Sequence, residues 1–200
     1  MQPLKTVTNS PVEIVYAGNL LYGRIDTLST ITSALRKINK NGVKMRLTVF
    51  SGTKVTDEQI SCINDGASAV FAGQKPFDEV KKILNHADIT LHVESFEPQM
   101  QKIVRYSFST KIIDCLQSGN TMLVVGPKNI ASVEYPRAIP GAIVVDDNRN
   151  LYAELLRIAS NPSLLIDSAK QTNGYAVEHH EISLVRRSLQ EDFKYLLNDC

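Results

Sequence analysis

Short apolar runs rich in β-branched residues recur along most of the chain, and segments with helical spacing of apolar positions lie between them. Nearly continuous apolar runs are typical of strands buried on both faces, as in parallel sheets covered by helices on each side. The sequence therefore predicts about six parallel strands, within residues 12–18 (VEIVYAG), 44–52 (KMRLTVFSG), 68–73 (SAVFAG), 88–93 (DITLHV), 121–127 (TMLVVGP) and 142–147 (AIVVDD).

The connections have helical patterns, and from residue 148 onward the pattern is entirely helical. We therefore predict a single α/β domain over residues 1–200, with a doubly wound, parallel, six-stranded Rossmann-like sheet and a helical C-terminus. In such a fold, ligands bind at the carboxyl ends of the strands, where the strand order reverses. In the first predicted helix, the apolar positions that share one face are Leu28, Ile31, Leu35 and Ile38.

Composition argues against several classes of function. The chain has 200 residues, 43% of them hydrophobic, and its 22 basic and 21 acidic residues leave a net charge of +1. Such a balance gives no electrostatic footprint for nucleic acid, so we expect no nucleic-acid partner. Three widely spaced cysteines, Cys62, Cys115 and Cys200, suit a reducing compartment. Because the sequence has neither an apolar run of membrane-spanning length nor a signal-peptide pattern, we expect a cytoplasmic protein.

Glycine or a small polar residue stands at the end of most predicted strands. A glycine there lets the backbone approach a ligand closely, although it also simply permits the turn. The sequence contains neither a G-x-G-x-x-G dinucleotide motif nor a Walker motif, so NAD and P-loop nucleotide chemistry lack support. The ligand-binding candidates at these strand ends are Gly18, Asn19, Ser51, Gly52, Gly73, Gln74 and Ser95.

Basic and hydroxyl residues gather at the same predicted edge of the sheet. Arg24, Lys54 and Lys111 are placed to neutralise a diphosphate, although each is alternatively a solvated surface charge. Lys111 follows a hydroxyl-rich stretch, "YSFST", in which Ser107 or Ser109 provides a helix cap. The helix that begins there carries a lone carboxylate in its first turns.

Four stretches occur in an order that points to a known family: "IVYAGNLLYGRIDTLSTITSAL", "RLTVFSG", "SAVFAGQKPFDEVKKILNHADITLHVESF" and "YSFSTKIIDCLQSGNTMLVVGP". Over roughly residues 12–197, this order resembles the C-terminal, donor-binding half of retaining GT-B glycosyltransferases, which use nucleotide sugars. The resemblance implies that the N-terminal, acceptor-binding domain is absent from this chain. Its most specific pieces are Val70-Phe71-x-Gly73, Ala87-Asp88-Ile89, and the helix from Asp114 to Gly119.

Enzymes of this family often carry the motif E-G-F-x-x-x-x-x-E at that helix. Aligned on Phe108, the second glutamate corresponds to Asp114, which implies that Asp114 accepts hydrogen bonds from the ribose hydroxyls. The first glutamate, which contacts the sugar, corresponds to Tyr106. The resemblance further implies that the donor diphosphate contacts Ser107, Ser109 and Thr110, and that the leaving group is stabilised without a metal cofactor by Arg24, Lys54 and Lys111.

The implied activity is glycosyl transfer from a nucleoside-diphosphate sugar to a sugar or lipid-linked acceptor, in polysaccharide or glycoconjugate biosynthesis. Because the acceptor site belongs to the missing domain, we expect the isolated chain to bind donor but transfer little. The full protein would then lie in the cytoplasm, either free or in peripheral contact with the cytoplasmic face of a membrane. Two alternatives stay open: a nucleotide-sugar epimerase of the same fold, and a non-catalytic nucleotide-sugar-binding or interaction module.

His92 and the segment of residues 95–106 each have two interpretations. His92 either touches the donor or belongs to the core, and residues 95–106 form either a lid or an insertion that covers the sheet. The pair Asp146 and Asp147 is expected to cap the following helix rather than bind a metal. The last helix is expected to pack toward the missing half through Leu184, Val185, Leu189, Phe193 and Leu196.

Overall fold

The predicted apolar runs form the strands of one parallel sheet. The computed structural model describes residues 6–198, and its strand order is β3-β2-β1-β4-β5-β6. Because the order reverses between β1 and β4, the ligand-binding crevice of a doubly wound sheet is expected at their carboxyl ends. The strands are β1 (Val12–Ala17), β2 (Met45–Phe50), β3 (Ala69–Gly73), β4 (Ile89–Val93), β5 (Thr121–Val125) and β6 (Ile143–Val145).

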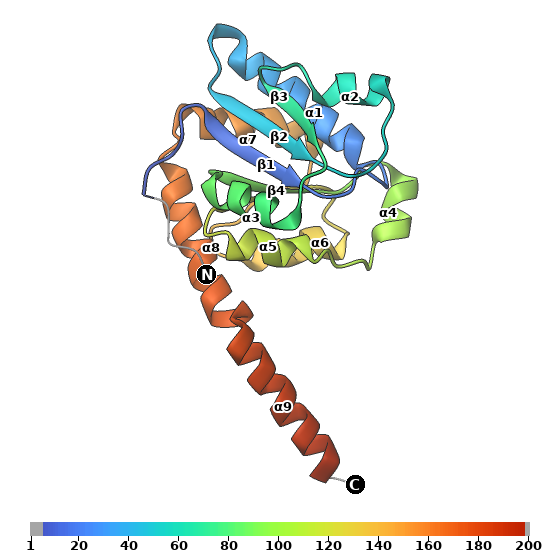
Figure 1. Ribbon diagram of the computed structural model, residues 1–200, viewed down its shortest axis with the longest axis vertical. Coiled ribbons are helices and arrows are strands. Elements are labelled where there is room, and N and C mark those ends of the chain that lie inside the picture. Colours follow the sequence, from blue (N-terminus) through green and yellow to red (C-terminus); the bar gives the residue numbers. More distant parts are fainter. Residues whose placement is uncertain (1–5, 199–200) are drawn as a thin grey trace.

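Helices cover both faces of this sheet, which confirms the doubly wound prediction (Figure 1). One face carries α1 (Arg24–Ile38) and α7 (Asn148–Ser160), and the other carries α3 (Phe77–His86), α5 (Lys111–Gln117) and α8 (Leu164–His180). The remaining elements are α2 (Asp57–Ile63), α4 (Pro98–Val104), α6 (Ala131–Glu134), α9 (Ile182–Asn198) and two short 3-10 helices, η1 (Asn39–Asn41) and η2 (Tyr135–Ala138).

The two faces are packed unequally. The largest apolar cluster joins the sheet to α1 and α7, and the predicted face of α1 is buried in it. On the other face, a small cluster around Val15 and Phe50 lies under α3, while a separate cluster lies under α5, α6 and α8. The region between α3 and α5 therefore lacks a continuous apolar core.

The segment between β4 and α5 is ordered around a helix rather than being a loop. Pro98 is the first residue of α4, a position where its missing N–H costs no hydrogen bond. The hydroxyl of Ser95 accepts a hydrogen bond from the N–H of Glu97, at 3.1 Å. Gly23 approaches both Ser95 and Met100, so α4 packs beside the loop that leads into α1.

The helical C-terminus is confirmed, and α9 extends away from the rest of the domain (Figure 1). Its packing against a missing half stays a prediction, and Cys200 lies outside the described residues. No helix within residues 6–198 is long and apolar enough to cross a membrane. The five apolar positions singled out on the last helix are 41–62% exposed: Leu184, Val185, Leu189, Phe193 and Leu196.

Candidate functional site

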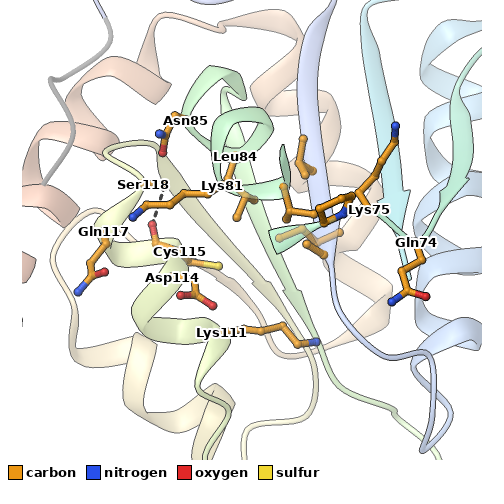
Figure 2. Close-up of a pocket in the computed structure, with 15 residues that line it drawn as sticks. Gln74, Lys75, Lys81, Leu84, Asn85, Lys111, Asp114, Cys115, Gln117 and Ser118 are labelled. Carbon is orange, nitrogen blue, oxygen red and sulfur yellow. Dashed lines mark hydrogen bonds between the residues drawn. The ribbon is translucent and has the colours of Figure 1, made fainter. Parts of the chain in front are cut away.

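A cavity of about 490 Å³ opens between α3 and α5, on the less continuously packed face of the sheet. Its apolar lining includes Val15 and Leu91 from the sheet and Leu84 from α3. Figure 2 shows polar side chains around it, from α3 on one side and α5 on the other. The cavity extends to the carboxyl edge of the sheet, where Gln74 and Lys111 line it.

Lys111, the first residue of α5, lies along the end of β1. Its Nζ donates a hydrogen bond to the hydroxyl of Tyr16 at 3.2 Å and lies 4.7 Å from the centre of that ring. A Cβ atom at Gly18 would lie 1.9 Å from Nζ, so glycine there leaves the space that the lysine occupies. Burial, with a smaller effect of the Arg24 charge, lowers the pKa of Lys111 to about 8. The amine is therefore mostly protonated at pH 7.

Arg24, the first residue of α1, is engaged differently from the prediction. Its Nε and Nη2 donate to the two carboxylate oxygens of Glu94 at 3.2 and 3.0 Å, and Nη1 donates to Oδ1 of Asn19 at 2.5 Å. The two side chains of the ion pair are only 8% and 2% exposed. The charge that the sequence assigned to a bound diphosphate is thus neutralised within the protein.

Glu94, directly after β4, organises this buried group of side chains. The hydroxyl of Ser132 donates to its Oε1 at 3.1 Å, and His92 Nε2 lies 3.3 Å from the same oxygen. Burial opposes ionisation of Glu94, but the hydrogen bonds and the positive charge of Arg24 hold the pKa of its carboxyl group well below its usual value. The carboxylate is therefore ionised at neutral pH.

His92 belongs to the core. Its side chain is completely buried, and neither ring nitrogen has hydrogen-bond geometry to a partner within the described residues, despite the short distance to Glu94. Burial lowers its pKa, so the imidazole is neutral. Of the two interpretations offered by the sequence, the structure supports the core residue, because no surface of His92 faces the cavity.

Asp114 lies one helical turn after Lys111 and lines the same wall of the cavity (Figure 2). Partial burial raises the pKa of its carboxyl group, and the charges of Lys81 and Lys111 oppose that rise. The cavity therefore holds an amine and a carboxyl group on one helix, with Lys81 contributed by α3. This carboxyl group was the sequence candidate for ribose binding.

The hydroxyl-rich stretch before α5 does not cap the helix through a side chain. Thr110 occupies the cap position without a side-chain hydrogen bond, and Ser107 and Ser109 are not at that position, so the predicted serine cap is wrong. Tyr106 is 84% exposed and has the Arg105 guanidinium 5.2 Å from its ring centre, whereas Phe108 packs edge-on against Tyr135. None of these side chains lines the cavity.

The other strand-end candidates divide into two groups. Gln74 lines the cavity and follows Gly73, whose φ of +66° is a conformation that favours glycine. Gly52 lies beside the Gln74 side chain. By contrast, Ser51 is buried, with its hydroxyl accepting from the N–H of Thr53 at 3.1 Å, and exposed Lys54 does not line the cavity.

No group of three or more metal-binding side chains occurs in the part of the chain that the structure describes. Asp147 accepts a hydrogen bond from the N–H of Arg149 at 2.9 Å and caps α7, as predicted, while Asp146 pairs with Arg137. The sequence analysis missed the roles of Tyr16, Glu94 and Lys81. The only signal for Glu94 was an acidic residue at the end of an apolar strand.

Neither a protein-family model nor a curated protein matches the sequence. Solved structures do match in three dimensions. The C-terminal domain of a glycosyl transferase group 1 family protein (LpcC) from Francisella tularensis matches with a TM-score of 0.66 and 13% identity, over 88% of this chain and 89% of that one. The chain has the fold of the C-terminal domain of a GT-B glycosyltransferase.

Longer chains contain a domain of the same fold. A trehalose 6-phosphate synthase from Burkholderia multivorans matches with a TM-score of 0.70 and 11% identity, over 95% of this chain and 44% of that one. WaaG, a glycosyltransferase involved in lipopolysaccharide biosynthesis, matches with a TM-score of 0.63 and 15% identity, over 90% of this chain and 46% of that one. An S. aureus TarM variant in complex with UDP matches with a TM-score of 0.67 and 12% identity, over 94% of this chain and 37% of that one. The chain thus spans less than half the length of these three proteins.

Proposed function

We propose that this chain is the donor-binding half of a retaining glycosyltransferase and binds a nucleoside-diphosphate sugar in the cavity between α3 and α5. The observation that carries the proposal is that Lys111 and Asp114 share one wall of this cavity at the carboxyl side of the sheet. Within residues 6–198, no carboxylate forms an ion pair with Lys111. A phosphate group and a ribose are the complementary partners of such an amine and such a carboxylate.

Lys111 is proposed to neutralise the diphosphate. When the bond from the anomeric carbon to the phosphate oxygen breaks, negative charge grows on that oxygen. A fixed ammonium group nearby stabilises the transition state more than the ground state, which is the condition for catalysis. The hydroxyls of Ser107, Ser109 and Thr110, just before Lys111, are proposed as additional donors to the phosphates.

Asp114 is proposed to accept hydrogen bonds from the two ribose hydroxyls. Its carboxylate has four lone-pair sites, enough for two donors at once. The apolar lining formed by Val15, Leu84 and Leu91 offers a surface against which a flat base can be buried. The presence of UDP in the structurally similar TarM supports the same ligand class for this chain.

The acceptor, a sugar or a lipid-linked sugar, is proposed to bind a second domain. The similar enzymes of known structure are more than twice as long as the part that this chain matches. Alone, the chain would bind donor but transfer little, because the closed cleft that excludes water is incomplete. We propose a cytoplasmic enzyme of polysaccharide or glycoconjugate biosynthesis, in peripheral contact with the membrane that holds its acceptor.

A non-catalytic nucleotide-sugar-binding module is the second candidate, and one specific observation favours it. The charge of Arg24 is neutralised by Glu94, which leaves Lys111 as the amine that lines the cavity next to β1. Binding and chemistry must therefore be measured separately. An epimerase has less support, because the amine of Lys111 and the carboxyl group of Asp114 are assigned here to the phosphate and the ribose.

Calorimetric titration of the chain with UDP, GDP, ADP and the corresponding nucleosides tests the binding proposal. One nucleoside diphosphate should bind. In a separate thermal-shift measurement, it should raise the melting temperature of the protein by an amount that follows the ratio of ligand concentration to Kd. Asp114→Ala should weaken binding of both the nucleotide and its nucleoside by about ten- to a hundredfold, because hydrogen bonds to a charged group contribute about 1.5–3 kcal/mol. Asp57→Ala, at an exposed acidic residue of α2, is the matched control. If none of these nucleotides binds, the proposed function is wrong.

A further inference from the structure

We infer that Glu94 is a positioning residue, which acts through Arg24 to orient the side-chain amide of Asn19 so that its N–H groups bind the diphosphate. This inference rests on the proposed function, because it concerns the same ligand. It assigns to the buried ion pair a role different from direct phosphate binding.

The orientation of the Asn19 amide is defined by two donors. Its Oδ1 accepts hydrogen bonds from Arg24 Nη1 at 2.5 Å and from the backbone N–H of Leu21 at 3.3 Å. A guanidinium and a backbone N–H can only donate, so the oxygen and not the nitrogen must face them. The amide nitrogen, Nδ2, is left on the opposite side of an exposed residue, and it donates to no described side chain or backbone group.

Each of the three guanidinium nitrogens of Arg24, which holds this oxygen, donates a hydrogen bond. Glu94 binds it through two parallel hydrogen bonds, a geometry that fixes the plane of the guanidinium. Glu94 is fixed in turn by Ser132 at its carboxylate and by Thr27, whose hydroxyl donates to its backbone oxygen at 2.9 Å. A buried ion pair contributes little net stability compared with apolar packing, so its value here is the fixed geometry it gives.

The same group of side chains reaches Lys111 through Tyr16. The Tyr16 hydroxyl donates to the backbone oxygen of Asn19 at 2.5 Å and accepts from Lys111 Nζ at 3.2 Å. Because burial raises the pKa of Tyr16, the hydroxyl keeps its proton and this direction of donation. Lys111 Nζ and Asn19 Nδ2 are therefore two donors held by one set of hydrogen bonds at the end of β1. Two donors at fixed positions suit a ligand with several acceptor oxygens, such as a diphosphate.

Calorimetry with inorganic pyrophosphate and with the best-binding nucleoside diphosphate, each on the full chain, tests this inference. Asn19→Ala should weaken binding of both ligands by about tenfold and leave binding of the nucleoside unchanged. Glu94→Gln should cause a similar loss, since a neutral amide cannot hold the guanidinium at both oxygens. Thr32→Val is the matched control: it removes a hydrogen bond from another buried threonine of α1, to the backbone oxygen of Leu28, touches neither Glu94 nor Arg24, and should not alter affinity.

The double variant separates positioning from general loss of structure. If Glu94 acts through Asn19, Glu94→Gln should weaken binding in the natural chain but not in the Asn19→Ala background. An equal loss in both backgrounds, or no loss from either single variant, would overturn the inference while leaving the proposed function intact. If Glu94→Gln does not fold, Arg24→Lys supplies the same comparison, because lysine cannot bridge Glu94 and Asn19. If the natural chain binds neither ligand, the proposed function fails as well.

Discussion

Helices α1 and α5 begin at the same edge of the sheet, and each has a basic residue at its first position, Arg24 and Lys111. A cation at the start of a helix is unfavourable, because the positive end of the helix dipole lies there. The two helices resolve this differently. Arg24 is buried against Glu94, whereas Lys111 contacts a neutral tyrosine and lines the cavity. An unfavourable cation that the protein itself does not neutralise is the better candidate for binding an anionic ligand.

The largest difference between the two helices is expected in stability, when Glu94, the partner of Arg24, is removed in one variant and Lys111 itself is removed in another. Glu94→Ala leaves the Arg24 charge buried without a carboxylate, and we expect the free energy of unfolding to fall by about 3–5 kcal/mol. Lys111→Met removes a charge whose pKa shows that burial disfavours it, so stability should change little or increase. Urea denaturation measures both. Similar losses for the two variants would mean that Lys111 is also a structural cation.

Ligand binding should show the opposite order. Lys111→Met should weaken binding of a nucleoside diphosphate by about ten- to a hundredfold, because it removes a charge-assisted hydrogen bond, of about 1.5–3 kcal/mol. Lys54→Met is the control: this lysine also follows a strand at the same edge but does not line the cavity. Its affinity should stay within about twofold of the natural chain. An equal effect of both substitutions would indicate a nonspecific electrostatic contribution.

The pH dependence of binding gives a smaller effect with a defined sign. The pKa of Lys111 is lowered from 10.5 to about 8, so its positive charge is present at pH 7 and is lost as the pH rises through that value. Diphosphate affinity should therefore fall between pH 7 and pH 9. In the Lys111→Met variant the profile should be nearly flat. A steep fall that persists in this variant would assign the titration to another group.

Gly18→Ala should have the smallest effect on stability while still altering the site. The added Cβ would meet the far end of the Lys111 side chain, which can move, so we expect a stability change below about 1 kcal/mol. The displaced amine should nevertheless bind a diphosphate several-fold more weakly. In the Lys111→Met background the same change should leave affinity unaltered. A large loss of stability would show that the backbone at Gly18 has a role of its own.

The sequence predicted the sheet well because its evidence is local. Six apolar runs identify strands buried on both faces, and the spacing from Leu28 to Ile38 identifies the buried face of α1. The helix α4 was not predicted, although Pro98 at its first position is a typical start signal. Thr110, rather than the serine expected, occupies the cap position of α5.

The site was predicted only in part, because contacts between distant segments decide it. Arg24 and Lys111 look equivalent in the sequence, each a basic residue near a strand end. They differ because Glu94, 70 positions after Arg24 in the sequence, pairs with Arg24 but not with Lys111. Glu94 directly follows β4, the strand next to β1. His92 lies near a strand end as well, but its side chain is turned into the core. Alternation along a strand does not reveal which polar side chains find partners when both faces are covered.

The most direct test of the account is a crystal structure of the chain with a bound nucleoside diphosphate. We expect a phosphate oxygen within hydrogen-bond distance of Lys111 Nζ and of Asn19 Nδ2, and the ribose hydroxyls on Asp114. Arg24 should remain paired with Glu94. A diphosphate bound directly by Arg24 with Glu94 displaced, or a nucleotide bound away from the cavity between α3 and α5, would contradict the account.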